Sequence, residues 1–124
     1  MMMKRNLLWT ILFIAVSSLF IDSDATADKV RGVTDTKVKV GIMGDLTGPV
    51  AAIWIPCANA LKDYFRHVND SGGIHGRKVK PIIEDDRYSI PLALSAFKKL
   101  VFRDKVLVLM AASGVGHTHS LIPL

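Results

Sequence analysis

Residues 37–86 open with KVKVGIMGDLTGP (37–49), pass through NDSGG (69–73) and close on KVKPIIEDD (78–86). In the first segment apolar residues alternate with other residues through Val38, Val40 and Ile42, as in a buried strand. A polar loop then runs from Gly44 to Pro49, and proline cannot continue a strand ladder. The order strand, loop, helix, glycine turn and strand is typical of an α/β fold.

The segment between the two strands is predicted to be a helix that begins near Ile55 and Pro56, because proline is favoured in a first turn. Apolar residues recur every three or four positions on one face, which is expected to be buried. These residues are Leu61, Tyr64, Phe65 and Val68. Ser71-Gly72-Gly73 should end this helix, since glycine adopts the left-handed cap conformation at little cost.

The rest of the chain repeats the alternation of strands and helices. The second strand is predicted over Lys78 to Glu84, where Pro81 indicates an edge position or a bulge. A second helix is predicted over Pro91 to Phe102 and a third strand over Val106 to Ala111. The residues expected on the buried face of this helix are Leu92, Ala96, Phe97, Leu100 and Val101. Helices of this length can cross between parallel strands, so we expect a parallel sheet with helices on both faces.

The first 27 residues have the three-part pattern of an export signal. Lys4 and Arg5 precede an apolar run from Leu7 to Ile21, which is short for a membrane span. Ala25-Thr26-Ala27 provides small residues for cleavage after Ala27, and an uncleaved anchor is the alternative. We therefore expect a signal peptide over 1–27, an extended leader over 28–36 and a periplasmic product.

The composition disfavours a nucleic-acid partner. The chain carries 16 Lys and Arg against 11 Asp and Glu, a net charge of +5, and the basic residues are scattered along the sequence. Nucleic-acid binding usually requires a basic run or face. The single cysteine, Cys57, cannot form an internal disulfide.

Two loops carry most of the polar chemistry: Asp45 to Pro49 after the first strand, and Ala112 to Thr118 after the third. If the first and third strands are neighbours, the loops meet where the strand order reverses, which is where open α/β sheets bind ligands. The hydroxyls and glycine amides of these loops are suited to a carboxylate or another small anion. The alternative is that both loops are ordinary turns.

Other site chemistries are disfavoured. Gly41, Gly44 and Gly48 do not have the G-x-G-x-x-G spacing of a dinucleotide site, and no phosphate loop is present. Glu84-Asp85-Asp86 and the pair His117 and His119 could hold a metal, but consecutive carboxylates are more often solvated or helix-capping, and two histidines are a weak signal. The sequence predicts no metal, no cofactor and no catalytic residue.

From Lys37 onward the chain resembles the amino-terminal part of the type I periplasmic substrate-binding proteins of ABC transporters, in the branched-chain amino acid (Leu/Ile/Val) binding group. The resemblance covers essentially all of the chain after the signal and lies in the order and spacing of several short motifs. These are Gly41 to Pro49, Ala58-Asn59-Ala60, Tyr64-Phe65, Val68-Asn69, Gly72-Gly73-Ile74, Gly76-Arg77-Lys78, Glu84-Asp85-Asp86 and Lys99-Leu100-Val101.

The resemblance implies a monomeric, two-lobed binding protein that closes on an amino acid and passes it to a membrane permease. It implies no covalent chemistry, so the protein is not expected to be an enzyme. The loop after the third strand would offer amides and a hydroxyl to the ligand carboxylate, and the first loop and the residues after it would line the cleft. The site residues implied are Leu46, Thr47, Ile53, Trp54, Ser113, Gly114, Val115 and Thr118.

The sequence departs from the family pattern at three places. Ala111-Ala112 replaces the usual glycine-proline, Val115 occupies a customary hydroxyl position, and Trp54-Ile55 replaces an aromatic-glycine pair. The family's chains are also much longer, so residues 37–124 are expected to form an incomplete amino-terminal lobe. Closure requires two lobes and a hinge, so such a fragment should bind ligand weakly or not at all alone.

Two alternatives come from other protein classes. The first is the ligand-sensing ectodomain of a receptor, which shares the fold of the binding proteins. The second is a fragment of a flavodoxin-like or dinucleotide-binding enzyme, which the absence of a phosphate-binding glycine pattern disfavours.

Overall fold

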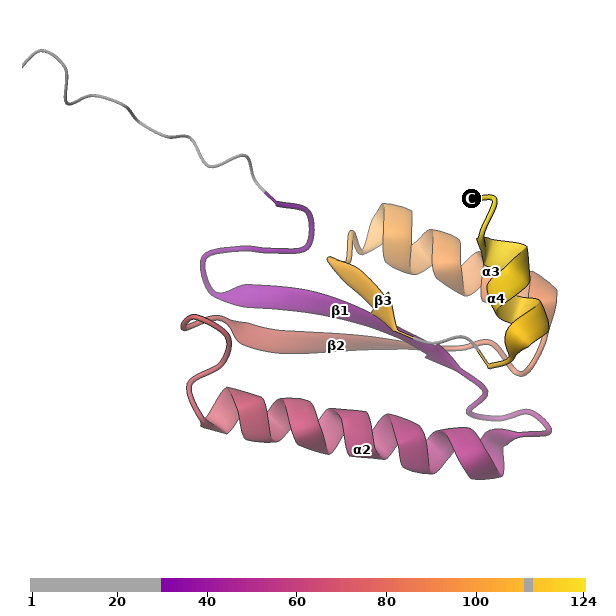
Figure 1. Cartoon of the computed structure of the whole chain (residues 1–124), viewed down its shortest axis with the longest axis horizontal. Helices are drawn as coiled ribbons and strands as arrows, with labels where there is room; N and C mark the ends of the chain where they lie inside the picture. The colour runs from indigo at the N-terminus through magenta and orange to yellow at the C-terminus, as the bar shows by residue number, and fades with distance from the viewer. Residues whose placement is uncertain (1–29, 111–112) are drawn as a thin grey trace, which may run out of the picture.

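The computed structural model describes residues 30–110 and 113–124, and the predicted signal peptide lies outside them (Figure 1). The elements alternate between strand and helix, as expected for an α/β fold. They are β1 (Lys37–Gly44), α2 (Ala51–Asp70), β2 (Lys78–Asp85), α3 (Ile90–Lys98), the π-helical turn η2 (Lys99–Arg103), β3 (Val108–Met110) and α4 (Val115–Leu121).

The strands form one parallel sheet in the order β2-β1-β3. β1 pairs with β2 in continuous register from Lys37 opposite Lys78 to Gly44 opposite Asp85. β3 pairs with the other side of β1, with Val40 opposite Val108. β2 is therefore an edge strand of the described sheet, which confirms the position that Pro81 indicated.

Helices cover both faces of the sheet (Figure 1). Val40, Ile42 and Val79 point to the α2 face, where apolar residues of that helix pack on them. Met43 points to the opposite face, against α3 and η2. The partly buried residues on the α2 face are Leu61, Phe65, Val68, Ile83 and Met110, and those on the other face are Ile82, Phe97, Leu109 and Leu121. The predicted parallel sheet with helices on both faces is confirmed.

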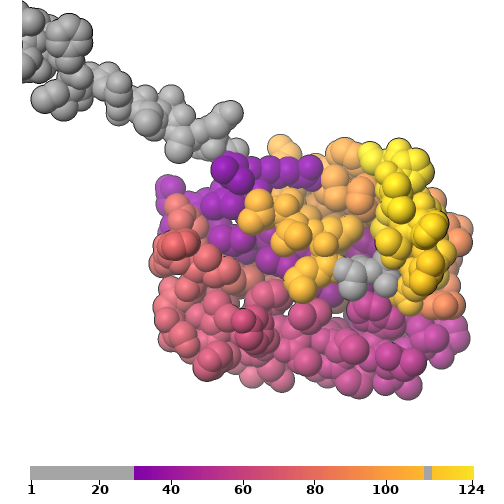
Figure 2. Space-filling model, viewed as in Figure 1, coloured from indigo at the N-terminus to yellow at the C-terminus, as the bar shows by residue number. Residues whose placement is uncertain are grey.

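In the space-filling view α2 forms one long side of the molecule and α4 forms one end (Figure 2). The carboxyl end of α2 is tied to the edge strand by Asn69. Its side-chain amide donates to the carbonyl of Val79 at 2.8 Å, and its oxygen accepts from the Val79 N–H at 2.7 Å. The edge strand β2 is thus held by a side chain as well as by β1.

The start of α2 differs from the prediction. The helix begins at Ala51, because the carbonyl of Val50 accepts hydrogen bonds from the N–H groups of Ile53 at 2.9 Å and Trp54 at 3.2 Å. Pro56 therefore lies inside the helix. It is exposed, so the hydrogen bond that proline cannot donate is lost on the solvent side.

Three further expectations were wrong in detail. Tyr64 and Leu92 were predicted to be buried, yet they are 62% and 41% exposed, because the sheet contacts a narrower stripe of each helix than the periodicity suggested. The second helix is not regular to Phe102, since it passes into η2 after Lys98. β3 begins at Val108 instead of Val106, and Ala111 lies outside the described residues.

Leu100 provides a test of this packing, because its side chain is fully buried beneath the sheet. Leu100→Ala should lower the free energy of unfolding by about 2–5 kcal/mol, through lost burial and the cavity left behind. Urea denaturation followed by circular dichroism measures this change.

The matched control is Leu92→Ala, which removes the same atoms from an exposed position on the adjoining helix. Its cost should stay below about 1 kcal/mol. Equal costs for the two variants would contradict the described core.

Candidate functional site

The loops that follow β1 and β3 meet at one end of the sheet. Their strands are neighbours, whereas the chain visits β2 between them, so the strand order reverses here as predicted. A direct contact joins the two sides, because Nε1 of Trp54 donates to the carbonyl of Ser113 at 3.4 Å. We call this end of the sheet, formed by residues 45–54 and 113–118, the switch-point crevice, after its place in the strand order.

The first loop is shaped by Asp45, which is fully buried. One carboxylate oxygen accepts the N–H of Gly48, and the other accepts the N–H of Val50 at 2.7 Å. A Cβ atom at Gly48 would stand 2.6 Å from Asp45 Oδ1 and 2.7 Å from the carbonyl oxygen of Arg87, so the site requires glycine. This loop is a fixed structure and not a loose connection.

Trp54 lies against the end of β1. A Cβ atom on Gly44 would approach the Trp54 ring to 2.5 Å, so the indole packs directly on the backbone there. Together with the hydrogen bond to Ser113, this contact places the indole between the ends of β1 and β3. Trp54 therefore links the two loops at the switch point.

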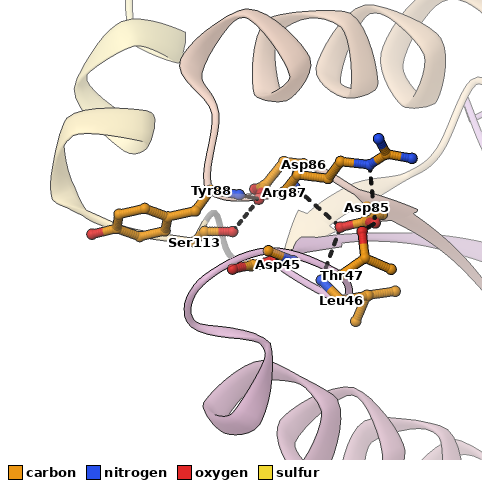
Figure 3. A network of polar contacts seen from close by, with 9 residues as sticks. Asp45, Leu46, Thr47, Asp85, Asp86, Arg87, Tyr88 and Ser113 are labelled. Carbon is orange, nitrogen blue, oxygen red and sulfur yellow. Dashed lines mark hydrogen bonds and ion pairs between the residues drawn. The ribbon is translucent and has the colours of Figure 1, made fainter.

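Asp85 fixes the other half of the first loop (Figure 3). Its Oδ1 accepts the N–H of Leu46 at 2.8 Å, and its Oδ2 accepts the hydroxyl of Thr47 at 2.6 Å. The N–H of Arg87 also donates to Oδ1, and the Arg87 guanidinium lies 3.7 Å from Oδ2. The end of β2 thus holds the loop that follows β1.

Burial of the Asp85 carboxyl acts to raise its pKa, but the groups around it outweigh that effect. The Thr47 hydroxyl, the N–H groups of Leu46 and Arg87 and the Arg87 guanidinium all stabilise the charged form, so the pKa of Asp85 lies below its ordinary value of 3.8. Ionised Asp85 therefore stabilises the fold at neutral pH.

Asp86 accepts a hydrogen bond from the loop after β3, as Asp85 does from the loop after β1 (Figure 3). It is fully buried, and its Oδ1 accepts the N–H of Tyr88 at 3.0 Å and the hydroxyl of Ser113. Its Oδ2 is buried without a hydrogen-bond partner among the described residues. Arg87 and Tyr88 have φ of 50° and 54°, a strained conformation that concentrates at functional sites.

A histidine completes this side of the crevice. The His117 ring is buried and packs on the Tyr88 ring, with 4.8 Å between the ring centres. Its Nε2 has no hydrogen-bond partner among residues 30–110 and 113–124. Buried polar atoms of this kind usually have partners, so the end of the sheet holds unused hydrogen-bonding capacity.

The structure brings together half of the site residues expected from the sequence. Leu46, Thr47, Trp54 and Ser113 belong to the connected network just described. Gly114 lies beside Ser113 as the N-cap residue of α4.

The other three expected residues lie on helices and outside this network. Ile53 is on α2 and 66% exposed, and Val115 is on α4 and 77% exposed. Thr118 is also on α4, where its hydroxyl donates to the carbonyl of Gly114 at 3.2 Å. The predicted loop to Thr118 is therefore wrong, because α4 begins at Val115.

Sequence reasoning missed the residues that organise the site. Asp45 was recognisable as an aspartate three residues before a glycine, a spacing that suits a side chain capping its own turn. Asp85 and Asp86 were expected to be solvated or capping, and the structure places them in hydrogen bonds to loop backbone and hydroxyl groups. Nothing in the sequence pattern singled out Tyr88.

Metal centres and membrane spans are two further possibilities for the described part of the chain. No group of three or more His, Cys, Asp and Glu side chains there could hold a metal ion. None of the helices in residues 30–110 and 113–124 combines the length and apolar character that a membrane span requires.

The role of Asp85 leads to a pH-dependent prediction. Asp85→Asn should lower the free energy of unfolding at pH 7 by about 1–3 kcal/mol, since hydrogen bonds to a charged group are lost. Because the pKa of Asp85 is depressed in the fold, its contribution is complete above the unfolded value of 3.8 and is lost as the pH falls below it. The difference between the two proteins should therefore shrink at pH 3, which urea denaturation at both pH values measures.

The control for this prediction is Asp63→Asn, which changes the same group in an exposed pair with Arg66. Its effect should be below about 1 kcal/mol at both pH values. A constant difference between wild type and Asp85→Asn from pH 7 to pH 3 would contradict the proposed role of Asp85.

Solved structures share this fold. The fatty acid ABC transporter substrate-binding protein from Thermomonospora curvata is 28% identical with a TM-score of 0.70, and the match covers 77% of this chain and 24% of that chain. The branched-chain amino acid transporter substrate binding protein LivJ from Streptococcus pneumoniae, solved with isoleucine, is 22% identical with a TM-score of 0.67, covering 71% and 25%.

A third structure is the solute binding protein of an ABC transporter from Rhodopseudomonas palustris, solved with 3,4-dihydroxy benzoic acid. It is 28% identical with a TM-score of 0.52, covering 59% of this chain and 20% of that chain. The chain thus spans a quarter or less of the length of these three structures. No curated protein matches the sequence.

A family model described as periplasmic binding protein matches residues 37–124, which run from the start of β1 to Leu124. The match includes both loops of the switch-point crevice and every strand described. The chain therefore belongs to the periplasmic binding protein family.

Proposed function

We propose that residues 37–124 form one wall of the ligand cleft of an ABC transporter substrate-binding protein for a branched-chain or related amino acid. The observation that carries this proposal is the switch-point crevice, where Trp54 and Ser113 meet at the ends of two neighbouring parallel strands. Ligands of open α/β sheets bind at this position. Membership of the periplasmic binding protein family supports the same role.

The ligands named for the similar proteins support a small carboxylic acid as the ligand of this chain. One protein is described as a fatty acid transporter component, one was solved with isoleucine and one with 3,4-dihydroxy benzoic acid. These three ligand types share a carboxyl group and an apolar part. The crevice offers the apolar indole of Trp54 and neighbouring polar groups. These groups suit a ligand that has an apolar part and a polar part.

The proposal extends to location and partners. An export signal over residues 1–27, cleaved after Ala27, would deliver the mature chain to the periplasm. There it would act as a monomer and release its ligand to the permease of an ABC transporter. Its role is binding, so no catalytic residue and no cofactor is part of the proposal.

The described residues form one wall, so affinity in this chain should be low. A ligand resting against one surface buries less area than one enclosed between two lobes. We expect a dissociation constant of about 1 mM or larger, which corresponds to a binding free energy no more favourable than about −4 kcal/mol.

Titration of the ¹⁵N-labelled protein with leucine, isoleucine and valine tests this function by NMR. The amide signals of Leu46, Thr47, Ser113 and Gly114 and the indole signal of Trp54 should shift in the millimolar range, because these groups line the crevice. Calorimetry under the same conditions should detect no micromolar binding.

The internal control is the opposite end of the sheet, where Phe102 and Lys105 should show no shift, and glucose should shift neither group. Micromolar binding, or shifts confined to the opposite end, would overturn the proposal.

A further inference from the structure

We propose that Ser113 receives a hydrogen-bond donor of the ligand, such as an ammonium group, and not its carboxylate. This inference rests on the proposed function, since it concerns the ligand of the same crevice. It departs from the expectation drawn from the sequence, in which the Ser113 hydroxyl donates to a ligand carboxylate. The reason lies in the partner that the hydroxyl already has.

A serine hydroxyl has one hydrogen to donate and two lone pairs that accept, whereas a carboxylate oxygen only accepts. The hydroxyl of Ser113 donates its hydrogen to Oδ1 of Asp86 (Figure 3). Only the lone pairs of this oxygen remain for a ligand. A ligand carboxylate would also present lone pairs, so the two groups would repel each other.

Other oxygen atoms of Asp86 and Ser113 are also hydrogen-bond acceptors, which favours a ligand group that donates. Oδ2 of Asp86 is buried and lacks a hydrogen-bond partner among the described residues. The Ser113 carbonyl accepts one long hydrogen bond, from Trp54 at 3.4 Å, and a carbonyl oxygen has a second lone pair. The hydroxyl and the carbonyl of Ser113 therefore both offer lone pairs near a buried carboxylate, and a buried carboxylate gains most from a positive partner.

Asp86 cannot easily turn away from Ser113. Its own N–H donates to the carbonyl of Gly44 at 3.1 Å, and its carbonyl accepts the N–H of Ser89 at 2.8 Å. Its Oδ1 is also held by the N–H of Tyr88 at 3.0 Å. The direction of the Ser113 hydroxyl is thus set by a carboxylate that backbone hydrogen bonds fix on both sides.

No charged side chain described nearby donates a hydrogen bond to the free lone pairs of Ser113 or to Oδ2 of Asp86. The guanidinium of Arg87 turns to Asp85, where it lies 3.7 Å from Oδ2. The His117 ring lies against Tyr88, and its Nε2 has no partner among the described residues. The lone pairs of the Ser113 hydroxyl therefore remain for an ammonium group, and the fully buried Asp86 acts on the ligand through Ser113 as a positioning residue.

Three ligands with the same carbon branching separate the two possibilities. Isoleucine carries both charged groups, 2-methylbutylamine carries only the ammonium, and 3-methylpentanoate carries only the carboxylate. NMR titration of the labelled protein should show that isoleucine and 2-methylbutylamine shift the amide signals of Ser113 and Gly114. The response to 3-methylpentanoate should be at least about tenfold weaker, since a charged hydrogen bond is worth about that factor.

Variants then assign the effect to the hydroxyl. Ser113→Ala should weaken the response to 2-methylbutylamine about tenfold, and Ser113→Thr, which keeps a hydroxyl, should restore it. Asp86→Asn offers an amide hydrogen to Ser113, so the preference for the amine over the acid should fall. The matched control is Ser120→Ala, because the Ser120 hydroxyl donates to the carbonyl of His117 at 2.7 Å within α4 and should not affect binding.

The outcomes distinguish this inference from the function on which it rests. If 3-methylpentanoate shifts Ser113 as strongly as isoleucine does and 2-methylbutylamine has no effect, the inference fails and the binding function stands. If none of the three ligands shifts the crevice signals, both fail. Should Asp86→Asn not fold, the three ligands and the Ser113 variants still decide the question.

Discussion

Two adjacent carboxylates at the end of β2 hold the loops at the carboxyl end of the sheet. Asp85 accepts hydrogen bonds from Leu46 and Thr47 in the loop after β1, and Asp86 accepts the hydroxyl of Ser113 in the loop after β3. β1 lies between β2 and β3, so these side chains connect the end of an edge strand to both loops of the crevice. Without these bonds each loop would have to be ordered by its own turn chemistry.

The two carboxylates differ in what surrounds them. Asp85 is supplied with donors on both oxygens and has an arginine nearby, which is the environment of a structural carboxylate. Asp86 is buried more completely and has one oxygen without a described partner. Adjacent residues of the same type thus take different roles: one stabilises a loop, and the other also gives the crevice its acceptor character. The left-handed backbone of Arg87 and Tyr88 turns the chain sharply just after them.

Much of the fold was predictable because local patterns and the tertiary structure agree. The alternation of Val38, Val40 and Ile42 identified β1, the Gly72 and Gly73 pair marked the end of α2, and Pro81 marked the edge strand. The start of α2 was not predictable from Pro56, because the helix begins earlier at the carbonyl of Val50. Helical periodicity likewise overestimated the buried stripe at Tyr64, since the width of the stripe depends on how the helix rests on the sheet.

The sequence by itself determined the order of strands and helices, the parallel sheet and the pair of loops at its carboxyl end, because these follow from hydrophobic periodicity, glycine and proline. Only the tertiary structure decided how the loops meet and which atoms they offer. Hydrogen bonds between residues far apart in the chain, such as that from Ser113 to Asp86, have no periodic signature in a sequence. The direction of the Ser113 hydroxyl, and with it the polarity of the crevice, is set by Asp86, which directly follows β2.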